Sequence, residues 1–370
     1  MKFTCEKTLL VSGISVASRT VAQKSTIAAL EGIHLRAGHK LELTGYNLET
    51  GITVSVPAEI QSYGDCILPA RLFFDIIRKL PDDLVTISID EKLQVSIRCG
   101  ISSFTITATD AENYPELPDV EYENAISIPQ NALREMIGGT LFSVSDNQAR
   151  PIHTGCLFEI TEDDVTMIAV DGYRLALRRY FFPVPIARTL KFVAPASALK
   201  EVEKILSDTD EEAKFTLGTR HILFEIGNAT LVCRLLEGEF LDWRRVVPEN
   251  NPILMSANVA ELTASIERVG LIISEKVKSP VRCIFGDNFG DFRTATTIGE
   301  AHDICQLAGQ GQDLEIGFNC RYLLEALKAV PTSEVILELS NGLSPIVMTP
   351  PVNKRDYAYM VLPVRLKDGG

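Results

Sequence analysis

Apolar side chains recur at positions i, i+3, i+4 and i+7 in six separate segments, and this spacing predicts six amphipathic helices. Shorter segments between them alternate apolar and polar residues, which predicts strands that cover one face of a sheet. The six predicted helices span residues 7–19, 69–80, 130–142, 195–206, 258–273 and 319–330. This mixture of helices and strands predicts an α+β protein.

The predicted helices form a threefold repeat. Three of them begin at residues 69, 195 and 319, which are 126 and 124 residues apart, and an apolar strand-like stub precedes each. A period this constant predicts three similar domains, each built from two strand–helix–strand–strand–strand units. Polar segments at 124–125 and 250–252 read as linkers, so we expect domains at 1–125, 126–250 and 251–370. Predicted strands after the three helices are 84–89, 93–97, 104–107, 213–217, 222–226, 230–235, 335–339, 346–348 and 357–361.

Composition adds the expected compartment. The chain has 370 residues, 46% hydrophobic, but no apolar run near the ~20 residues that span a bilayer and no apolar signal segment at its start. We therefore expect a soluble cytoplasmic protein with no membrane partner. The eight cysteines form no Cys-x-x-Cys pair and the five histidines show no metal-ligand spacing, so we expect buried apolar thiols and neither metal nor cofactor.

Charge changes the picture in two steps. The net charge of −13 argues against a protein that holds nucleic acid by overall attraction. The charge is uneven, however: the six predicted helices together carry +4 and the remainder −17. If the helices share one surface, that surface is much less acidic than the rest of the molecule. Acidic loops between strands are the alternative explanation of this contrast.

Common catalytic motifs are absent from the sequence. It contains no G-x-x-x-x-G-K-[ST] phosphate loop, no G-x-G-x-x-G, no H-E-x-x-H and no G-x-S-x-G. The adjacent carboxylates at 82–83 and 163–164 fall at predicted turns and read as solvated. The motifs therefore provide no candidate catalytic residues. A cytosolic multidomain enzyme with an active site assembled from distant residues stays an alternative.

Three local motifs accompany the repeat. Residues 170–176, Val-Asp-Gly-Tyr-Arg-Leu-Ala, place an Asp-Gly turn between two apolar runs and predict a hairpin. Residues 362–366, Leu-Pro-Val-Arg-Leu, end an apolar strand at a proline. With residues 240–246, Phe-Leu-Asp-Trp-Arg-Arg-Val, they resemble the T-D-G-H-R-L-A, M-P-M-R-L and F-P-D-Y-R-R-V motifs of the bacterial DNA polymerase III β sliding-clamp family. The resemblance extends over nearly the whole chain.

The resemblance implies a head-to-tail homodimer that closes as a ring, with helices inside and sheets outside. It implies a non-catalytic DNA sliding clamp, a processivity factor that encircles duplex DNA without sequence preference and tethers the polymerase. The partners it implies are a second copy of the chain, double-stranded DNA, the catalytic subunit of the replicative polymerase, the clamp loader and other proteins that carry a clamp-binding motif. A protein-only scaffold that never touches DNA is the second alternative.

The resemblance also implies roles for particular residues. DNA-facing cations would be Lys24, Arg71, Arg78 and Arg150, although Ala196 and Ser197 stand where basic residues are expected in the second block. The dimer contact would pair an edge strand bearing Phe104 and Ile106 with the segment Leu271, Ile272 and Ile273.

An apolar groove between the second and third domains would bind a short extended peptide from each partner protein. Its expected lining is Ile152, His153, Gly172, Tyr173, Arg174, Leu175, Leu241, Arg245, Val246, Leu343, Pro345, Met360, Val361, Leu362, Pro363, Val364 and Arg365. Tyr173, Leu241 and Val364 depart from the His, Pro and Met of the family motifs, and His153 stands where an apolar residue is expected. Loss of a flexible methionine at 364 is expected to narrow the range of peptides.

Overall fold

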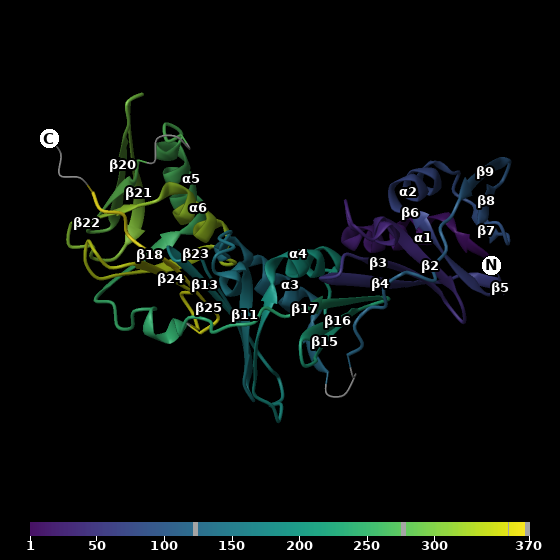
Figure 1. The fold of residues 1–370 in the computed structure, drawn as a ribbon. Coiled ribbons are helices and arrows are strands. Elements are labelled where there is room, and N and C mark those ends of the chain that lie inside the picture. Colours follow the sequence, from purple (N-terminus) through teal and green to yellow (C-terminus); the bar gives the residue numbers. More distant parts are fainter. Residues whose placement is uncertain (121–124, 275–278, 354, 367–370) are drawn as a thin grey trace. The chain divides into compact units, whose positions relative to one another are not determined.

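A computed structural model describes residues 1–120, 125–274, 279–353 and 355–366 (Figure 1). Residue 124 of the first predicted linker lies outside this part of the chain. The chain divides into two compact units, the first made of Met1–Arg134 and Ser197–Leu235, the second of Glu135–Ala196 and Leu236–Gly370. Each unit is described by itself below.

All six predicted helices are confirmed. They are α1 (Lys7–Ala17), α2 (Ala70–Lys79), α3 (Gln130–Gly138), α4 (Ala196–Ile205), α5 (Val259–Gly270) and α6 (Cys320–Lys328). The third is shorter than predicted, because two glycines at 138 and 139 weaken the helix there and a separate 3-10 turn, Leu141–Ser143, follows. Asn258 and Asn319 cap α5 and α6 by accepting backbone N–H bonds, which satisfies donors that the first helical turn leaves free.

The first unit contains two sheets, with strand orders β5-β1-β7-β8-β9 and β10-β15-β16-β17-β4-β3-β2-β6. Their strands are β1 (Lys2–Glu6), β2 (Gly32–Ala37), β3 (Leu41–Tyr46), β4 (Thr50–Val56), β5 (Glu59–Ser62), β6 (Gly64–Pro69), β7 (Leu84–Ile89), β8 (Gln94–Cys99), β9 (Ser102–Thr107), β10 (Ile126–Pro129), β15 (Glu212–Leu217), β16 (His221–Ile226) and β17 (Ala229–Arg234).

The second unit contains one continuous sheet of the order β14-β11-β12-β13-β25-β24-β23-β18-β21-β20-β19-β22. Its strands are β11 (Gly155–Ile160), β12 (Asp164–Val170), β13 (Arg174–Phe181), β14 (Leu190–Pro195), β18 (Ile253–Asn258), β19 (Val281–Gly286), β20 (Phe289–Ala295), β21 (Glu300–Ala308), β22 (Leu314–Phe318), β23 (Glu334–Leu339), β24 (Ile346–Thr349) and β25 (Tyr357–Val361). In Figure 1, α5 and α6 lie side by side against part of this sheet.

The repeated strand–helix–strand–strand–strand order is present six times along the chain. These six strand–helix–strand–strand–strand segments are linked in pairs, because the first strand of each segment pairs with a strand of its neighbour. The pairs are β1 with β7, β6 with β2, β18 with β23 and β22 with β19. Neighbouring repeats are joined where β17 pairs with β4 and β13 pairs with β25. These joints make the sheets continuous, which is why the two compact units do not coincide with three repeats.

Alternation along the strands separates a core face from an outer face. In β8, for example, Val95, Ile97 and Cys99 are buried while the residues between them are more exposed. In the second unit, a core of aromatic and aliphatic side chains fills the space between the sheet and helices α5 and α6. Full burial of one such side chain contributes roughly 1.5–3 kcal/mol to stability. Helices α5 and α6 already cover this face of the sheet.

Candidate functional site

An apolar cluster covers the opposite face of strands β11, β12, β13, β24 and β25 in the second unit. We call it the face cluster. Its buried members are Leu157, Ile168, Val170, Leu175, Leu177, Val193, Phe240, Val347 and Met360, with Ile152, Leu236, Trp243, Val247, Ala358 and Leu362 half-buried around them. Among the described residues, the members of the face cluster come from strands, loops and two 3-10 turns, and none lies on an α-helix.

Exposed apolar side chains occur in segments that flank members of the face cluster in the sequence. Leu343 is 78% exposed, Tyr173 62%, Leu241 40% and Val364 38%, and Val246 is also exposed. They come from the β12–β13 turn, the long loop before β18, the β23–β24 turn and the segment after β25. The Leu362 N–H donates to the Tyr173 carbonyl at 2.8 Å, so two of these segments are directly joined. Leaving this much apolar surface open is typical of a protein- or peptide-binding face.

The β12–β13 turn has the conformation that its Asp-Gly pair predicts. Asp171 Oδ1 accepts from the backbone N–H groups of Tyr173 at 2.8 Å and Arg174 at 3.0 Å. Gly172 has φ +93°, a left-handed conformation that a side chain would strain, although space around it is open. The turn therefore fixes the backbone at Tyr173, whose ring stacks on that of Tyr322 of α6 with 6.0 Å between the centroids.

Two predicted groove residues lie on the other face of the sheet. Arg174 and Val361 are opposite one another on β13 and β25, as are Leu175 and Met360 one position along. Because side chains alternate across a strand, Leu175 and Met360 join the face cluster while Val361 packs in the core beneath α5 and α6. Sequence motifs do not separate the two faces, which explains why the expected lining contains residues of both.

Arg174 is a buried cation with several partners. Its side chain is 8% exposed, donates to Asp171 Oδ2 at 2.9 Å and also pairs with Glu325 of α6. Its guanidinium lies 4.4 Å from the Tyr322 ring centroid and 5.5 Å from that of Phe142. An arginine this well paired fixes α6 to the β13 hairpin.

The remaining predicted groove residues lie at several places in the second unit, and two of them, Val364 and Arg365, line a cavity beside β19–β21. His153 is half-buried with its ring 5.3 Å from that of Phe240 at 79°, so it packs edge-to-face as an aromatic would. Burial, with the nearby Arg150, lowers the pKa of His153, which favours its neutral apolar form. Pro345 and Pro363 are half-buried next to the exposed Leu343 and Val364, and Arg245 and Arg365 are exposed.

A strand edge in the first unit is a second candidate site. Strand β9 ends its sheet and pairs only with β8 among the described residues. Phe104 is 40% exposed, Ile106 is half-buried, and Ile101 beside the strand is fully exposed. An edge with free backbone groups and apolar side chains is a template for another strand.

The second unit has a comparable edge that sequence analysis missed. Strand β21 pairs with β20 along its length, but in the described chain it meets β18 only through Leu307 and Ala308. Its segment 300–306 is therefore open on one side, and Ile304 on it is 56% exposed. The predicted interface residues follow α5, with Leu271 83% exposed and Ile272 and Ile273 half-buried. The mixed polarity of β21 gave no sequence signal of an interface.

The four predicted DNA-facing cations are at the surface. Lys24 lies in a bend after α1, Arg71 in the first turn of α2, and Arg150 just before a 3-10 turn; all three are exposed. Within the described residues, none of these three has a carboxylate at ion-pair distance. Arg78, in the last turn of α2, pairs with Asp75 at 3.2 Å.

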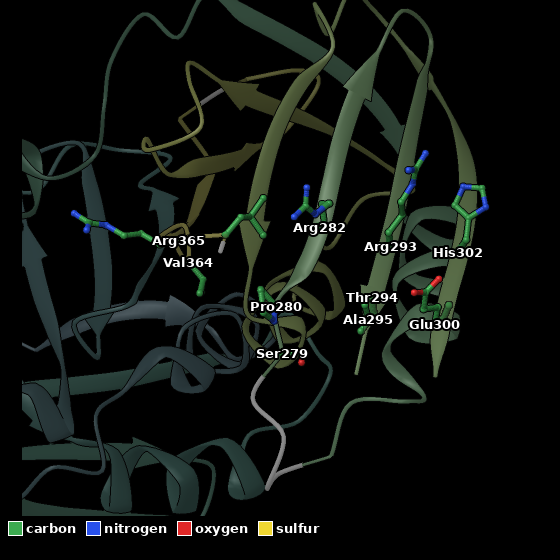
Figure 2. A pocket seen from close by; sticks show the side chains of 12 residues that line it. Ser279, Pro280, Arg282, Arg293, Thr294, Ala295, Glu300, His302, Val364 and Arg365 are labelled. Carbon is green, nitrogen blue, oxygen red and sulfur yellow. The ribbon is translucent and has the colours of Figure 1, made fainter. Parts of the chain in front are cut away.

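A cavity of about 920 Å³ lies on the outer face of β19–β21 beside the C-terminal segment (Figure 2). Arg282, Arg293 and His302 stand in register across the three strands. Each has a carboxylate partner: Arg282 pairs with Glu315, while Asp291 lies 2.6 Å from Arg293 and 3.1 Å from His302. Arg282 and Arg293 are thus each paired within the protein, while Arg365, which also lines the cavity, is exposed.

Potential metal ligands do not gather in the described part of the chain. It contains no group of three or more His, Cys, Asp or Glu side chains placed to hold a metal ion. All eight cysteines are buried and free, as predicted, and burial raises the pKa of Cys66 to about 12, far from a reactive thiolate. Among the described residues, no helix has both the length and the apolar character to cross a bilayer.

Comparison with known proteins gives a consistent result. Three family models match in order: the DNA polymerase III beta subunit N-terminal domain over residues 1–118, its central domain over 127–242 and its C-terminal domain over 244–365. The beta sliding clamp of Staphylococcus aureus is 30% identical over 99% of both chains. The expected family, and with it the α+β class of three clamp domains, is confirmed.

Solved structures agree in fold. A DNA polymerase sliding clamp from Bacillus subtilis has a TM-score of 0.94 at 29% identity, covering 99% of this chain and 100% of that chain. A sliding clamp from Pseudomonas aeruginosa bound to griselimycin has a TM-score of 0.93 at 28% identity, with the same coverage.

Proposed function

The chain belongs to the DNA polymerase III beta subunit family, the sliding clamps, and from this premise we propose that two copies close head to tail into a ring around duplex DNA. A sliding clamp is a non-catalytic processivity subunit that works with DNA and a replicative polymerase. The ordered match of three clamp-domain models along the whole chain carries the proposal. We further propose domain boundaries at 125/126 and 250/251, and the cytoplasm as the compartment.

The proposed mechanism is topological. A closed ring stays on DNA without tight contacts and raises the effective concentration of a bound polymerase at the primer end. Sequence-specific contacts would hinder sliding, whereas lysine and arginine contacts to phosphates do not depend on sequence. Lys24, Arg71, Arg78 and Arg150 are proposed to make such contacts, and their surface positions support this.

We propose that the ring closes by pairing strand β9 of one copy with the open edge of β21 in the other. Both edges have free backbone groups, so each interface would continue a ladder of hydrogen bonds. Phe104 and Ile106 on one side, and Leu271, Ile272 and Ile273 on the other, would bury apolar surface beside that ladder. Because the two edges are different surfaces of the chain, the contact is head to tail, and two such contacts close a ring when each relates the copies by a half-turn.

The face cluster is proposed to be the groove that binds extended peptides of the polymerase, the clamp loader and other clamp-binding proteins. The residues proposed to line it are Ile152, His153, Gly172, Tyr173, Leu175, Leu241, Arg245, Val246, Leu343, Pro345, Met360, Leu362, Pro363, Val364 and Arg365. Arg174 and Val361 would support it from the opposite face of the sheet. We also propose that this chain, like the Pseudomonas clamp, binds griselimycin, and that griselimycin binds at the face cluster.

A primer-extension assay tests the proposed function. The clamp loader, the polymerase and a primed circular template are combined with or without this protein, and product length per binding event is measured. We expect products at least tenfold longer with the protein present, and a return to short products with Phe104→Asp. Equal lengths with and without the protein would favour a scaffold that never acts on DNA.

A further inference from the structure

The loop between β17 and β18 forms one border of the face cluster. It contributes Leu241, Arg245 and Val246, and its centre is a single 3-10 turn, Trp243–Arg245. Backbone hydrogen bonds at this turn are internal: Arg245 donates to Asp242, and Val246 and Val247 donate to Trp243. Such a turn has no ladder to hold it against the sheet, so side chains must fix its position.

One carboxylate adds to the attachment that Phe240, Trp243 and Val247 provide by packing in the face cluster. Glu159, on β11, is 9% exposed and accepts from the Trp243 indole N–H at 3.1 Å. The same oxygen lies 2.8 Å from the Arg244 guanidinium, and the other oxygen lies 3.0 Å from Lys191 of the adjacent strand β14. The Arg244 guanidinium also lies 4.3 Å from the Trp243 ring centroid. Two donors from the turn and one from the sheet thus meet on a single group.

The charge of Glu159 suits this arrangement. Burial by itself raises the pKa of this carboxyl, but hydrogen bonds from Arg244, Lys191 and Trp243 outweigh burial and lower it, so the group is ionised at neutral pH. An ionised acceptor binds each donor more strongly than a neutral amide would. The indole that it holds packs against the face cluster.

We propose that Glu159 is a positioning residue for the partner groove: it fixes Trp243 and Arg244, and through them places Leu241, Arg245 and Val246 for ligand binding. The inference rests on the proposed function, because it assigns the face cluster as the groove. Glu159 itself touches no ligand in this account. It acts on affinity through the loop.

Intrinsic tryptophan fluorescence reports on the contact between Glu159 and Trp243, because Trp243 is the only tryptophan in the chain. The test compares wild type, Glu159→Gln and Arg244→Met in the full-length protein. Tryptophan emission and acrylamide quenching report the loop, and titration with griselimycin reports the groove. Asp291→Asn is the matched control, since Asp291 is a buried carboxylate of the same unit that is bound by Arg293 away from this loop.

We expect Glu159→Gln to shift Trp243 emission to the red, increase its quenching and weaken griselimycin binding about tenfold, the size of effect expected for a lost charged hydrogen bond. Arg244→Met, whose side chain is mostly exposed, should give a smaller change in the same direction. Asp291→Asn should leave emission and affinity unchanged even if it lowers the melting temperature.

Three results would overturn the inference. The first is unchanged emission and affinity in Glu159→Gln. The second is shifted emission with full affinity while Leu241→Ala still weakens binding, which leaves the groove assignment intact. The third is griselimycin binding that none of the variants, including Leu241→Ala, affects; that result removes the proposed groove as well.

Discussion

The β9 edge and the face cluster are both apolar surfaces left open, but they are open in different ways. At β9 one edge of the backbone is unpaired among the described strands, and Phe104 and Ile101 are exposed there. At the face cluster the backbone is fully used, since β13 pairs with both β12 and β25, and only side chains are available. A free edge demands another strand in register, whereas an apolar face accepts different side chains. The first suits self-association and the second suits many partners.

The largest expected effect is the loss of dimerisation when the β9 edge is changed. Phe104→Asp places a charge in the proposed dimer contact and should weaken dimerisation at least about 30-fold, since a central aromatic side chain commonly contributes about 2 kcal/mol or more to an interface. Leu84→Asp on β7 of the same sheet is the control, because Leu84 is 55% exposed but does not lie on the edge. Sedimentation of both variants at micromolar concentration measures the outcome; a dimeric Phe104→Asp would remove β9 from the interface.

The other half of the same contact has a structural complication. Replacing Ile272 and Ile273 together with Ala should also give monomers at micromolar concentration. Ile273, however, packs against the core of its own unit, so that variant should lose thermal stability too. Leu271→Asp separates the effects, because Leu271 is 83% exposed. Monomers with an unchanged melting temperature are expected for Leu271→Asp, and a stable dimer would contradict the assignment.

A smaller effect is expected at the face cluster. Leu241→Ala removes part of an exposed apolar side chain and should weaken griselimycin binding about fivefold, or roughly 1 kcal/mol, without changing dimerisation. Leu254→Ala is the matched control, since Leu254 is 47% exposed on β18 and does not belong to the cluster. If both variants bind equally well, the two kinds of surface are not functionally distinct in the way proposed.

DNA contacts should be separable from both surfaces. Arg71→Ala removes one proposed phosphate contact from each copy and should reduce the slope of log affinity against log salt by about 1 per cation. Arg36→Ala, on β2 and paired with Glu42, should leave the slope unchanged. Binding of a loaded clamp to circular DNA over a salt series measures both. Equal slopes in the two variants and wild type would take Arg71 out of the DNA-facing set.

The smallest expected effect is spectroscopic and depends on pH. The folded state lowers the pKa of Glu159 below its ordinary 4.5, so the stability that the carboxylate contributes is present above that value and is lost as the pH falls through the folded pKa. Trp243 emission should therefore shift at a pH below 4.5 in the wild type. In Glu159→Gln this step should be missing. An identical acid step in both proteins would assign it to another group.

Local periodicity predicted the helices and most strands, because each needs only its own segment. The 258–273 pattern gave α5, and the Asp-Gly pair at 171–172 gave the β12–β13 turn. Three further features depend on segments far apart in sequence. They are the joints of β17 with β4 and of β13 with β25, and the open edge of β21. No local pattern specifies such pairings.

The candidate site shows the same division. The motif resemblance places Arg174, Leu175, Met360 and Val361 together in the groove. Because side chains alternate along β13 and β25, Leu175 and Met360 lie on one face of the sheet and Arg174 and Val361 on the other. The hydrogen bond between Trp243 and Glu159 joins residues 84 positions apart, and no local sequence pattern predicts it. Long-range packing, rather than residue type, decides which side chains serve the site.

Retention on DNA of defined topology tests the central claim most directly. The protein is loaded onto a nicked circle by the clamp loader and isolated by gel filtration, and half of the sample is then cut once to linearise the DNA. A sliding ring should stay with the circle and leave the linear molecule by its ends. Equal retention on both forms, or on neither, would contradict a closed ring around DNA.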